Sequence, residues 1–255
     1  MMNSQTNKDF IIVADTDRGL VREKNEDYYG IFEPEKSELI ERLGVLVIVS
    51  DGMGGHFSGA EASRASVELI SEIYFDRAEG EPLERLKTAF DLANDCIFDD
   101  IGNGVEGMAG TTCTAALLFP EFAVVAHAGD SRAYLFRRDE VEQLTVDHSV
   151  VGEMMRKGVL TKEEARTHPH RNVITRAMGL KKGVEVDVIE SVPLWPGDTL
   201  LLCSDGLTSM VSEEEIRKIV AALPPEEASQ ALIIKAKKEG GNDNITVVLA
   251  RKRDR

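Results

Sequence analysis

Short apolar runs of strand length recur along the chain and predict most of its β-strands. The runs between Thr111 and Leu144 are separated only by short turns, which favours antiparallel pairing between neighbours. The predicted strands are Phe10–Ala14, Val45–Val49, Thr111–Phe119, Ala123–Ala128, Ala133–Phe136, Val141–Leu144, Val184–Ile189, Thr199–Cys203 and Asn244–Ala250.

Elsewhere the apolar positions recur at the spacing of an amphipathic helix. The predicted helices are about Gly59–Phe75, Leu83–Ile101, Ser149–Gly158, Thr161–Thr167 and a pair that begins at Ser212, breaks at Pro224–Pro225 and ends near Glu239. In the fourth of these, Thr161 and Glu164 fit a capping box. Strands cluster in antiparallel runs and helices come in consecutive pairs, so the pattern favours an α+β sandwich over a βαβ fold.

Composition narrows the class of protein. The 255 residues show no linker, so we expect one domain spanning residues 1–255, and 42% hydrophobic residues are ample for its core. A formal net charge of −15 repels a phosphate backbone, which argues against nucleic acid as a partner. The last residues, Arg251–Arg255, are basic, and we expect a solvated end.

Cysteines and apolar stretches indicate the compartment. Cys96, Cys113 and Cys203 are far apart and odd in number, which favours reduced, buried thiols. The polar start of the chain does not resemble a signal peptide, and no apolar run approaches the roughly 20 residues needed to cross a bilayer. We therefore expect a cytoplasmic protein without a membrane span, and a monomer.

Two of the apolar runs are followed by the same three residues. Both Val45–Val49 and Thr199–Cys203 are followed by Ser-Asp-Gly, which places Asp51 and Asp205 at strand ends. Further acidic residues lie at comparable positions: Glu26, Asp27, Asp130 and Asp243. Each of these residues taken alone could be an ordinary turn residue. Carboxylates that converged without a cation would repel one another, and a cluster of oxygen ligands suits Mg²⁺ or Mn²⁺.

The motifs around these residues resemble those of bacterial metal-dependent serine/threonine protein phosphatases of type 2C. Eight motifs occur in the family's order and cover nearly the whole chain: Asp17–Arg22 with Asn25–Asp27, Ser50–Gly55, Ala109–Thr112, Ala128–Arg132, Asp147–Ser149, Ile174–Gly179, Cys203–Leu207 and Asn242–Thr246. The resemblance implies a four-layer α-β-β-α sandwich of two antiparallel β-sheets flanked by antiparallel helices, with a helical flap at about residues 148–180.

The resemblance also implies a role for each acidic residue. A centre of two Mn²⁺ or Mg²⁺ ions would have Asp51 as the bridging ligand, the Gly52 carbonyl on the first ion, and Asp205 and Asp243 on the second. Asp130, with Asp205, matches a third-ion site. Glu26 matches a carboxylate that holds metal-bound water, Asp27 its supporting neighbour, and Arg22 the group that grips the substrate phosphate.

These roles agree with the chemistry of phosphate-ester hydrolysis. Two ions about 3.5–4 Å apart lower the pKa of a shared water, and an arginine fork binds phosphate through parallel hydrogen bonds. Met53 stands where many eukaryotic relatives have a histidine that is proposed to protonate the leaving group, so the general acid is a different group, and a metal-bound water is our first choice. For His56, His148, His168 and His170 we favour structural roles.

The expected substrates are phosphorylated proteins, and the expected partners include a cognate serine/threonine kinase or its targets. The charged segment from Ser149 to Arg171 either contacts substrate or is a solvated helical surface, and the sequence favours neither. Two other functions remain open. One is an inactive relative that only binds phosphoproteins, against which the complete set of aspartates argues, and the other is an enzyme of small phosphate esters.

Overall fold

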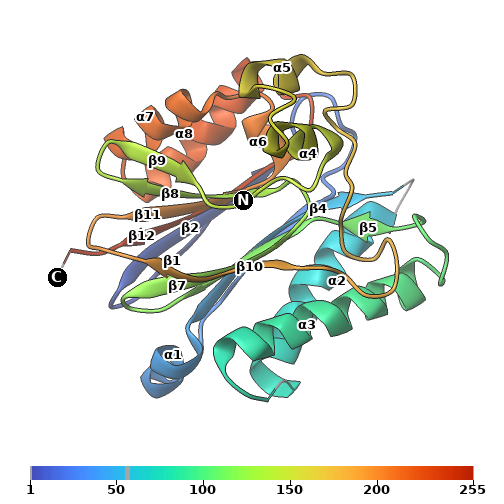
Figure 1. The fold of residues 1–255 in the computed structure, drawn as a ribbon. Coiled ribbons are helices and arrows are strands. Elements are labelled where there is room, and N and C mark those ends of the chain that lie inside the picture. Colours follow the sequence, from blue (N-terminus) through green and yellow to red (C-terminus); the bar gives the residue numbers. More distant parts are fainter. Residues whose placement is uncertain (1, 55–57, 78, 255) are drawn as a thin grey trace.

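Two antiparallel β-sheets pack face to face in the computed structural model, which describes residues 2–54, 58–77 and 79–254 (Figure 1). The first sheet has the order β1 (Asn3–Thr6), β2 (Phe10–Asp17), β12 (Ile245–Lys252), β11 (Thr199–Cys203), β8 (Arg132–Arg137), β9 (Glu140–Gln143). The second has the order β10 (Asp187–Pro193), β7 (Phe122–Ala128), β6 (Cys113–Leu118), β4 (Val45–Met53), β3 (Asp27–Phe32), and the short β5 (Gly110–Thr111) pairs with the end of β4.

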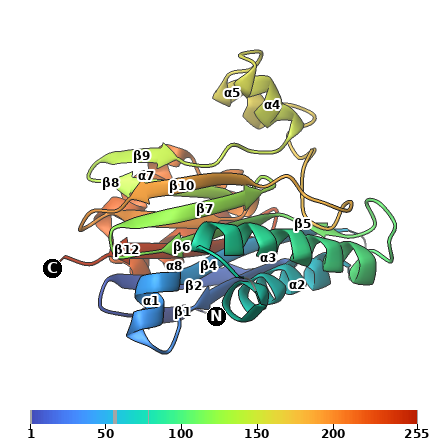
Figure 2. The ribbon, with the colours of Figure 1, turned by 60° about the horizontal axis from the view of Figure 1, so that its bottom comes forward.

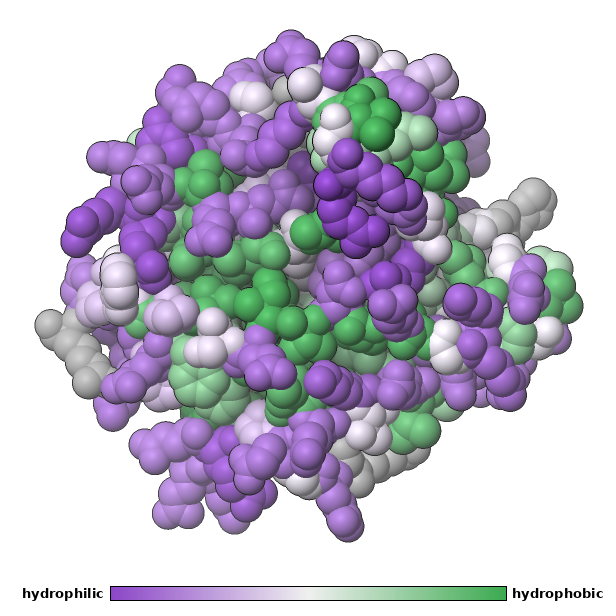
Figure 3. Space-filling model, in the orientation of Figure 1, coloured by the Kyte–Doolittle hydropathy of each residue, from purple (hydrophilic) through white to green (hydrophobic). Residues whose placement is uncertain are grey.

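Helices cover the outer face of each sheet and make the four layers. On the second sheet lie α2 (Ser58–Glu72) and α3 (Pro82–Cys96), each continued by one π-helical turn, Ile73–Arg77 and Ile97–Ile101. On the first sheet lie α7 (Glu213–Ala222) and α8 (Pro225–Lys238). The apolar residues visible on the face shown in Figure 3 gather across its middle, over the sheets, while hydrophilic residues dominate above and below. The expected α+β sandwich is thus confirmed.

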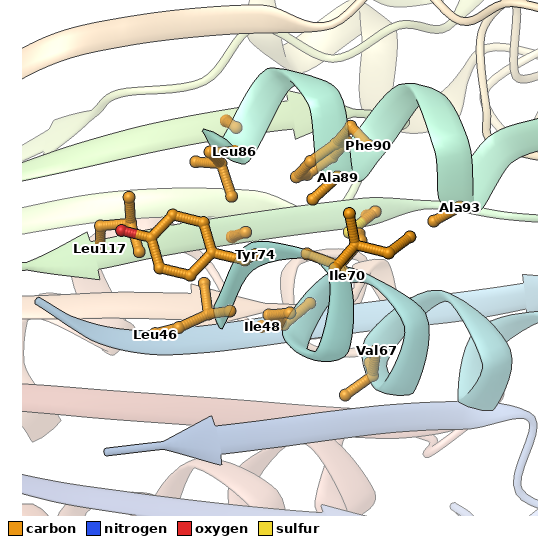
Figure 4. Packing of buried hydrophobic residues seen from close by; sticks show 14 of the residues in the cluster. Leu46, Ile48, Val67, Ile70, Tyr74, Leu86, Ala89, Phe90, Ala93 and Leu117 are labelled. Carbon is orange, nitrogen blue, oxygen red and sulfur yellow. The ribbon is translucent and has the colours of Figure 1, made fainter. Parts of the chain in front are cut away.

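Strand β4 shows why the central strands are apolar throughout. Side chains alternate across a strand, so Leu46 and Ile48 pack against α2 and α3, whereas Val45, Val47 and Val49 pack against the other sheet. Figure 4 shows Leu46 and Ile48 beside Tyr74, whose hydroxyl donates to the Leu43 carbonyl at 2.6 Å. Because both faces are buried, this strand is held firmly on either side, and its carboxyl end is a rigid place for a functional group.

Most predicted elements are present, with ends shifted by a few residues. The predicted strand Thr111–Phe119 is divided at Thr112, whose side chain is used in the site described below. The predicted strand Val184–Ile189 begins only at Asp187, although Val184 and Val186 pack against the same core cluster as Val188 in the strand. Four short elements had no sequence prediction: β1, β3, α1 (Ser37–Leu43) and α6 (Asp205–Thr208).

The expectation of a solvated basic end is wrong for Lys252. Arg251 and Lys252 belong to β12, and Lys252 is only 4% exposed. Its ammonium donates to the Pro120 carbonyl, lies 3.5 Å from the Asp9 carboxylate and stands over the Phe10 ring. A buried lysine needs such partners, and they are supplied by loops at this end of both sheets.

The cysteine prediction holds for two of three residues. All three are free, and Cys113 and Cys203 are buried, but Cys96 is only partly covered at the end of α3. The predicted capping box at Thr161 is formed, and Ser212 forms a second one with Glu215. None of the helices in the described residues is long and apolar enough to cross a membrane.

Two short helices, α4 (Val150–Arg156) and α5 (Lys162–Thr167), stand away from the sandwich (Figure 2). Their base is closed by a bridge between Ser149 and Ile174 and by a hydrogen bond from the Val150 amide to the Val173 carbonyl. An exposed ion pair, Lys162 to Glu213 at 3.2 Å, joins α5 to the start of α7. These helices occupy the position predicted for the flap.

Helix α3 provides a direct test of the packing. Phe90 is fully buried, whereas Leu92 on the same helix is 48% exposed. We expect Phe90→Ala to lower the free energy of unfolding by about 3–5 kcal/mol, because it leaves a cavity under the second sheet. Leu92→Ala should change it by no more than about 0.5 kcal/mol. Urea unfolding of both variants measures the difference, and equal effects would contradict the packing described for this layer.

Candidate metal centre and phosphate site

Aspartates from five separate segments of the chain meet at one end of the two sheets. Asp51 lies near the end of β4 and is paired in register with Asp27 at the start of β3. Asp205 begins α6 directly after β11, and its carboxylate is within hydrogen-bonding reach of Asp51. Asp130 and Asp243 also act electrostatically on Asp51. The structure therefore brings together the acidic residues that the sequence predicts as a cluster.

This cluster is electrostatically unfavourable by itself. Burial raises the pKa of Asp27 to about 7 and that of Asp205 to about 6, and repulsion from neighbouring carboxylates adds to both shifts. The same two causes raise the pKa values of Asp51 and Asp130 well above their usual range. Asp27 and Asp130 are only 5% and 7% exposed. Such a concentration of buried acid groups is the environment in which a bound cation is most stabilising.

The donor atoms fit hard divalent ions. Among the described residues, the buried Oδ1 of Asp27 has no hydrogen-bond partner. Within those same residues, no group of three or more Asp, Glu, His or Cys side chains is placed so that it could hold a metal ion. Mg²⁺ and similar ions are commonly held by one or two carboxylates while water fills the remaining positions. The arrangement therefore fits ions that share a few carboxylates, and it does not resemble a closed structural site.

Gly52 and Glu26 lie where α2 meets the end of β4. A Cβ atom on Gly52 would lie 2.1 Å from the Gly59 carbonyl oxygen, so only glycine fits between this strand and the helix. The Gly52 amide donates to the Glu26 carbonyl at 3.2 Å, and the Ser63 hydroxyl donates to the same oxygen at 2.5 Å. Glu26 is thus fixed through its main chain beside the carboxylate cluster.

Arg22 lies at the mouth of the site. Its guanidinium donates to Asp243 Oδ2 at 2.7 Å, and the two side chains are 54% and 31% exposed. Asp51 and Glu26 also act electrostatically on this arginine. An exposed guanidinium beside buried carboxylates can reach an anion that arrives from solvent.

Several neutral side chains hold the acidic residues in place. Thr112 Oγ1 accepts from the Asp51 amide and lies 2.6 Å from Ser131 Oγ, while Ser204 Oγ donates to Asp27 Oδ2 at 2.7 Å. Asn244 accepts from the Glu26 amide and donates to the carbonyls of Arg18 and Lys24. The sequence prediction gave these residues no role, although Thr112, Ser204 and Asn244 lie in the motifs that it singled out.

Three comparisons with known proteins agree with this site. Residues 20–234 match the family model described as Protein phosphatase 2C. The chain belongs to the protein phosphatase 2C family. A relative from Listeria innocua, the serine/threonine phosphatase stp, is 41% identical over 92% of both chains. A solved structure of the Mycobacterium tuberculosis phosphatase PstP/Ppp is 35% identical with a TM-score of 0.83, covering 96% of this chain and 100% of that one.

Another solved structure carries metal. It is described as the catalytic domain of the phosphatase PstP in complex with 2 manganese ions, with 33% identity and a TM-score of 0.79 over 96% of this chain and 99% of that one. The predicted family, fold and activity are therefore confirmed: this chain is a serine/threonine phosphatase of the metal-dependent 2C type, with bacterial relatives. The predicted roles of individual residues stay predictions. His56 lies outside the described residues, and Met53 ends β4.

The shifted pKa of Asp27 predicts how stability depends on pH. With a folded-state pKa of about 7, Asp27 binds more protons in the folded than in the unfolded phosphatase between about pH 4 and 7, so stability falls as pH rises through this range. In chelator, Asp27→Asn should reduce that fall by about 2–4 kcal/mol, since one pKa unit is worth about 1.4 kcal/mol. Urea unfolding at pH 4.5 and 7.5 measures it. An unchanged fall would show that Asp27 is ionised throughout.

Proposed function

We propose that this phosphatase hydrolyses phosphoserine and phosphothreonine in proteins with a water molecule activated by two Mn²⁺ or Mg²⁺ ions at the aspartate cluster. The observation that carries the proposal is the convergence of buried Asp51 and Asp205, with Asp27, Asp130 and Asp243 acting on the same point. When bound, the two ions would lower the pKa of a shared water and offset the charge of the phosphate. The related structure with two manganese ions supports this reading.

Each acidic residue has a proposed part in holding the ions. Asp51 would bridge them, because it lies at the centre of the cluster, where the charges of the other four aspartates all raise its pKa. The Gly52 carbonyl would complete the first ion, and Asp205 and Asp243 the second. Asp130, with Asp205, would hold a third ion, which the repulsion between these two carboxylates supports.

The remaining residues would act on water and substrate. Glu26 directly precedes β3 and lies beside the cluster, where its carboxylate can orient the attacking water. Asp27 begins β3 and would support Glu26 as its neighbour in the chain. Arg22 would bind the phosphate through its planar fork and stabilise charge on the equatorial oxygens during in-line attack. Its exposure at the mouth of the site, beside Asp243, supports that part.

The substrate class follows from the site and from the relatives. The carboxylate cluster would interact only with the phosphate group of a substrate. A preference for a phosphoprotein over a small ester must therefore depend on contacts elsewhere on the surface. The flap, residues 148–180, is our candidate because α4 and α5 project beside the body of the protein (Figure 2). A cognate serine/threonine kinase or its targets would be the natural partners. Three free cysteines support a cytoplasmic location.

The cluster is tested by removing single charges. Asp51→Asn and Asp205→Asn should each lower Mn²⁺-dependent hydrolysis of a phosphothreonine peptide by at least about a thousandfold, because each removes a ligand that positions the attacking water. Circular dichroism should show an intact fold. Asp139→Asn is a matched control, since that side chain is 97% exposed, and it should keep full activity. Full activity in either site variant would refute the proposed centre.

The flap is tested by deletion. Removing Thr161–Thr167, which contains α5, should reduce hydrolysis of phosphoproteins more than hydrolysis of a small chromogenic phosphate ester. The physical reason is that α5 can contact only a substrate that extends beyond the phosphate. The kcat/KM values of both substrates are compared between the deletion variant and the wild type. Equal losses on the two substrates would assign the flap a structural part only.

A further inference from the structure

A buried polar cluster lies behind Asp130, outside the carboxylate site. At its centre, the ring of His148 stacks on that of His127 in β7, with centroids 4.7 Å apart. The two histidines are 6% and 1% exposed, so they cannot meet substrate. His148 itself lies between β9 and α4, at the point where the flap leaves the sandwich.

His148 contacts the residue before Asp130 twice. Its main-chain amide donates to the Gly129 carbonyl at 2.7 Å, and its ring Nδ1 accepts from the Gly129 amide at 3.0 Å. Because a backbone N–H can only donate, Nδ1 must carry no proton, and the ring proton must be on Nε2. The peptide groups on both sides of Gly129 are thus held by His148: the Ala128–Gly129 peptide by its ring and the Gly129–Asp130 peptide by its main-chain amide.

The other ring nitrogen is held by the end of the flap. His148 Nε2 lies 3.1 Å from Asp187 Oδ2 at the start of β10 and 3.0 Å from Arg176 Nη1. The same Arg176 nitrogen donates to Asp187 Oδ1 at 2.6 Å. The Thr175 amide also donates to the His148 carbonyl at 2.8 Å. The ring is therefore oriented by residues that close the flap, and it transmits that orientation to the Asp130 turn.

The surroundings of Asp130 leave this turn few alternatives. Gly129 has φ +127°, and a Cβ atom there would lie 2.5 Å from Thr112 Cβ, so the turn is pressed against the residue that also binds the Asp51 amide. On its far side, Arg132 binds Asp147 through two hydrogen bonds of 2.8 and 2.6 Å. Residues 129–132 and 147–148 are consequently joined at both ends, and the His148 ring supplies the side-chain contact to the Gly129 amide.

We propose that His148 is a positioning residue: its Nδ1 acceptor fixes the Gly129 amide, directly before Asp130 in the chain, and so sets the Asp130 carboxylate for cation binding. The inference rests on the proposed role of Asp130 as a metal ligand. It differs from a packing role in that it depends on one hydrogen-bond acceptor, not on the volume of the ring or on the stack with His127.

Two substitutions separate these roles. His148→Asn places an amide oxygen where Nδ1 lies, so it can accept from the Gly129 amide, but it loses the contact with Asp187. His148→Gln places its amide near Nε2, so it can reach Asp187, but it leaves the Gly129 amide without an acceptor. Both variants lose the ring and its stack with His127, which makes them matched controls for each other.

The readout is Mn²⁺ binding measured by isothermal titration calorimetry on the whole enzyme without substrate. We expect the Gln variant to weaken the weakest Mn²⁺ site by about tenfold, the size typical for the loss of a group that orients a ligand, and the Asn variant to stay within about threefold of wild type. Equal weakening in both variants, or an unchanged affinity in the Gln variant, would overturn the inference. Thermal unfolding in chelator records any general loss of stability.

Asp130→Asn distinguishes a failure of the inference from a failure of its premise. Loss of one Mn²⁺ site in this variant supports the ligand assignment, and the two His148 variants then decide the positioning role. If Asp130→Asn leaves every Mn²⁺ affinity unchanged, the assignment of Asp130 is wrong and the positioning role falls with it. The proposed two-ion centre at Asp51 is tested separately, by the Asp51→Asn and Asp205→Asn variants.

Discussion

Mutual repulsion among buried carboxylates is the constraint on which the rest of this structure depends. Asp51, Asp205, Asp130 and Asp27 are close enough to raise one another's pKa values, and burial raises them further. A flexible loop would relieve such repulsion by moving apart. Here Asp51, Asp130 and Asp205 lie at the ends of strands that are largely buried on both faces, so the core holds them together, and the unfavourable energy is available to favour a cation.

Hydrogen bonds from uncharged side chains hold the acidic residues in these positions. Thr112 holds the Asp51 amide, Ser204 donates to Asp27, and Asn244 ties the segment bearing Glu26 to the end of β12. None of these contacts adds charge to the site. They fix the positions of the carboxylates without competing electrostatically for the ions, and His148 extends the same principle to Asp130 through the Gly129 peptide.

The sequence predicts the parts of this site that are encoded in short, contiguous motifs. An apolar run followed by Ser-Asp-Gly places Asp51 and Asp205 at strand ends, and the order of motifs indicates the family. The supporting contacts were not predictable in this way, because they cross from one sheet to the other. Ser204 follows β11 of the first sheet and meets Asp27 of β3 in the second, and Asn244 before β12 meets Glu26 before β3. Short elements such as β1 and α6 were not predicted, because so few residues show no clear periodicity of apolar positions.

The ion pair between Arg22 and Asp243 has a consequence for how the two kinds of ligand influence each other. The guanidinium that is suited to phosphate is bonded to a carboxylate that is suited to a cation. With the proposed roles, a cation that draws Asp243 inward would release Arg22, and an anion that engages Arg22 would release Asp243. By thermodynamic reciprocity, each ligand would then strengthen the binding of the other by the same factor. One exposed contact of 2.7 Å would thus couple the two binding events.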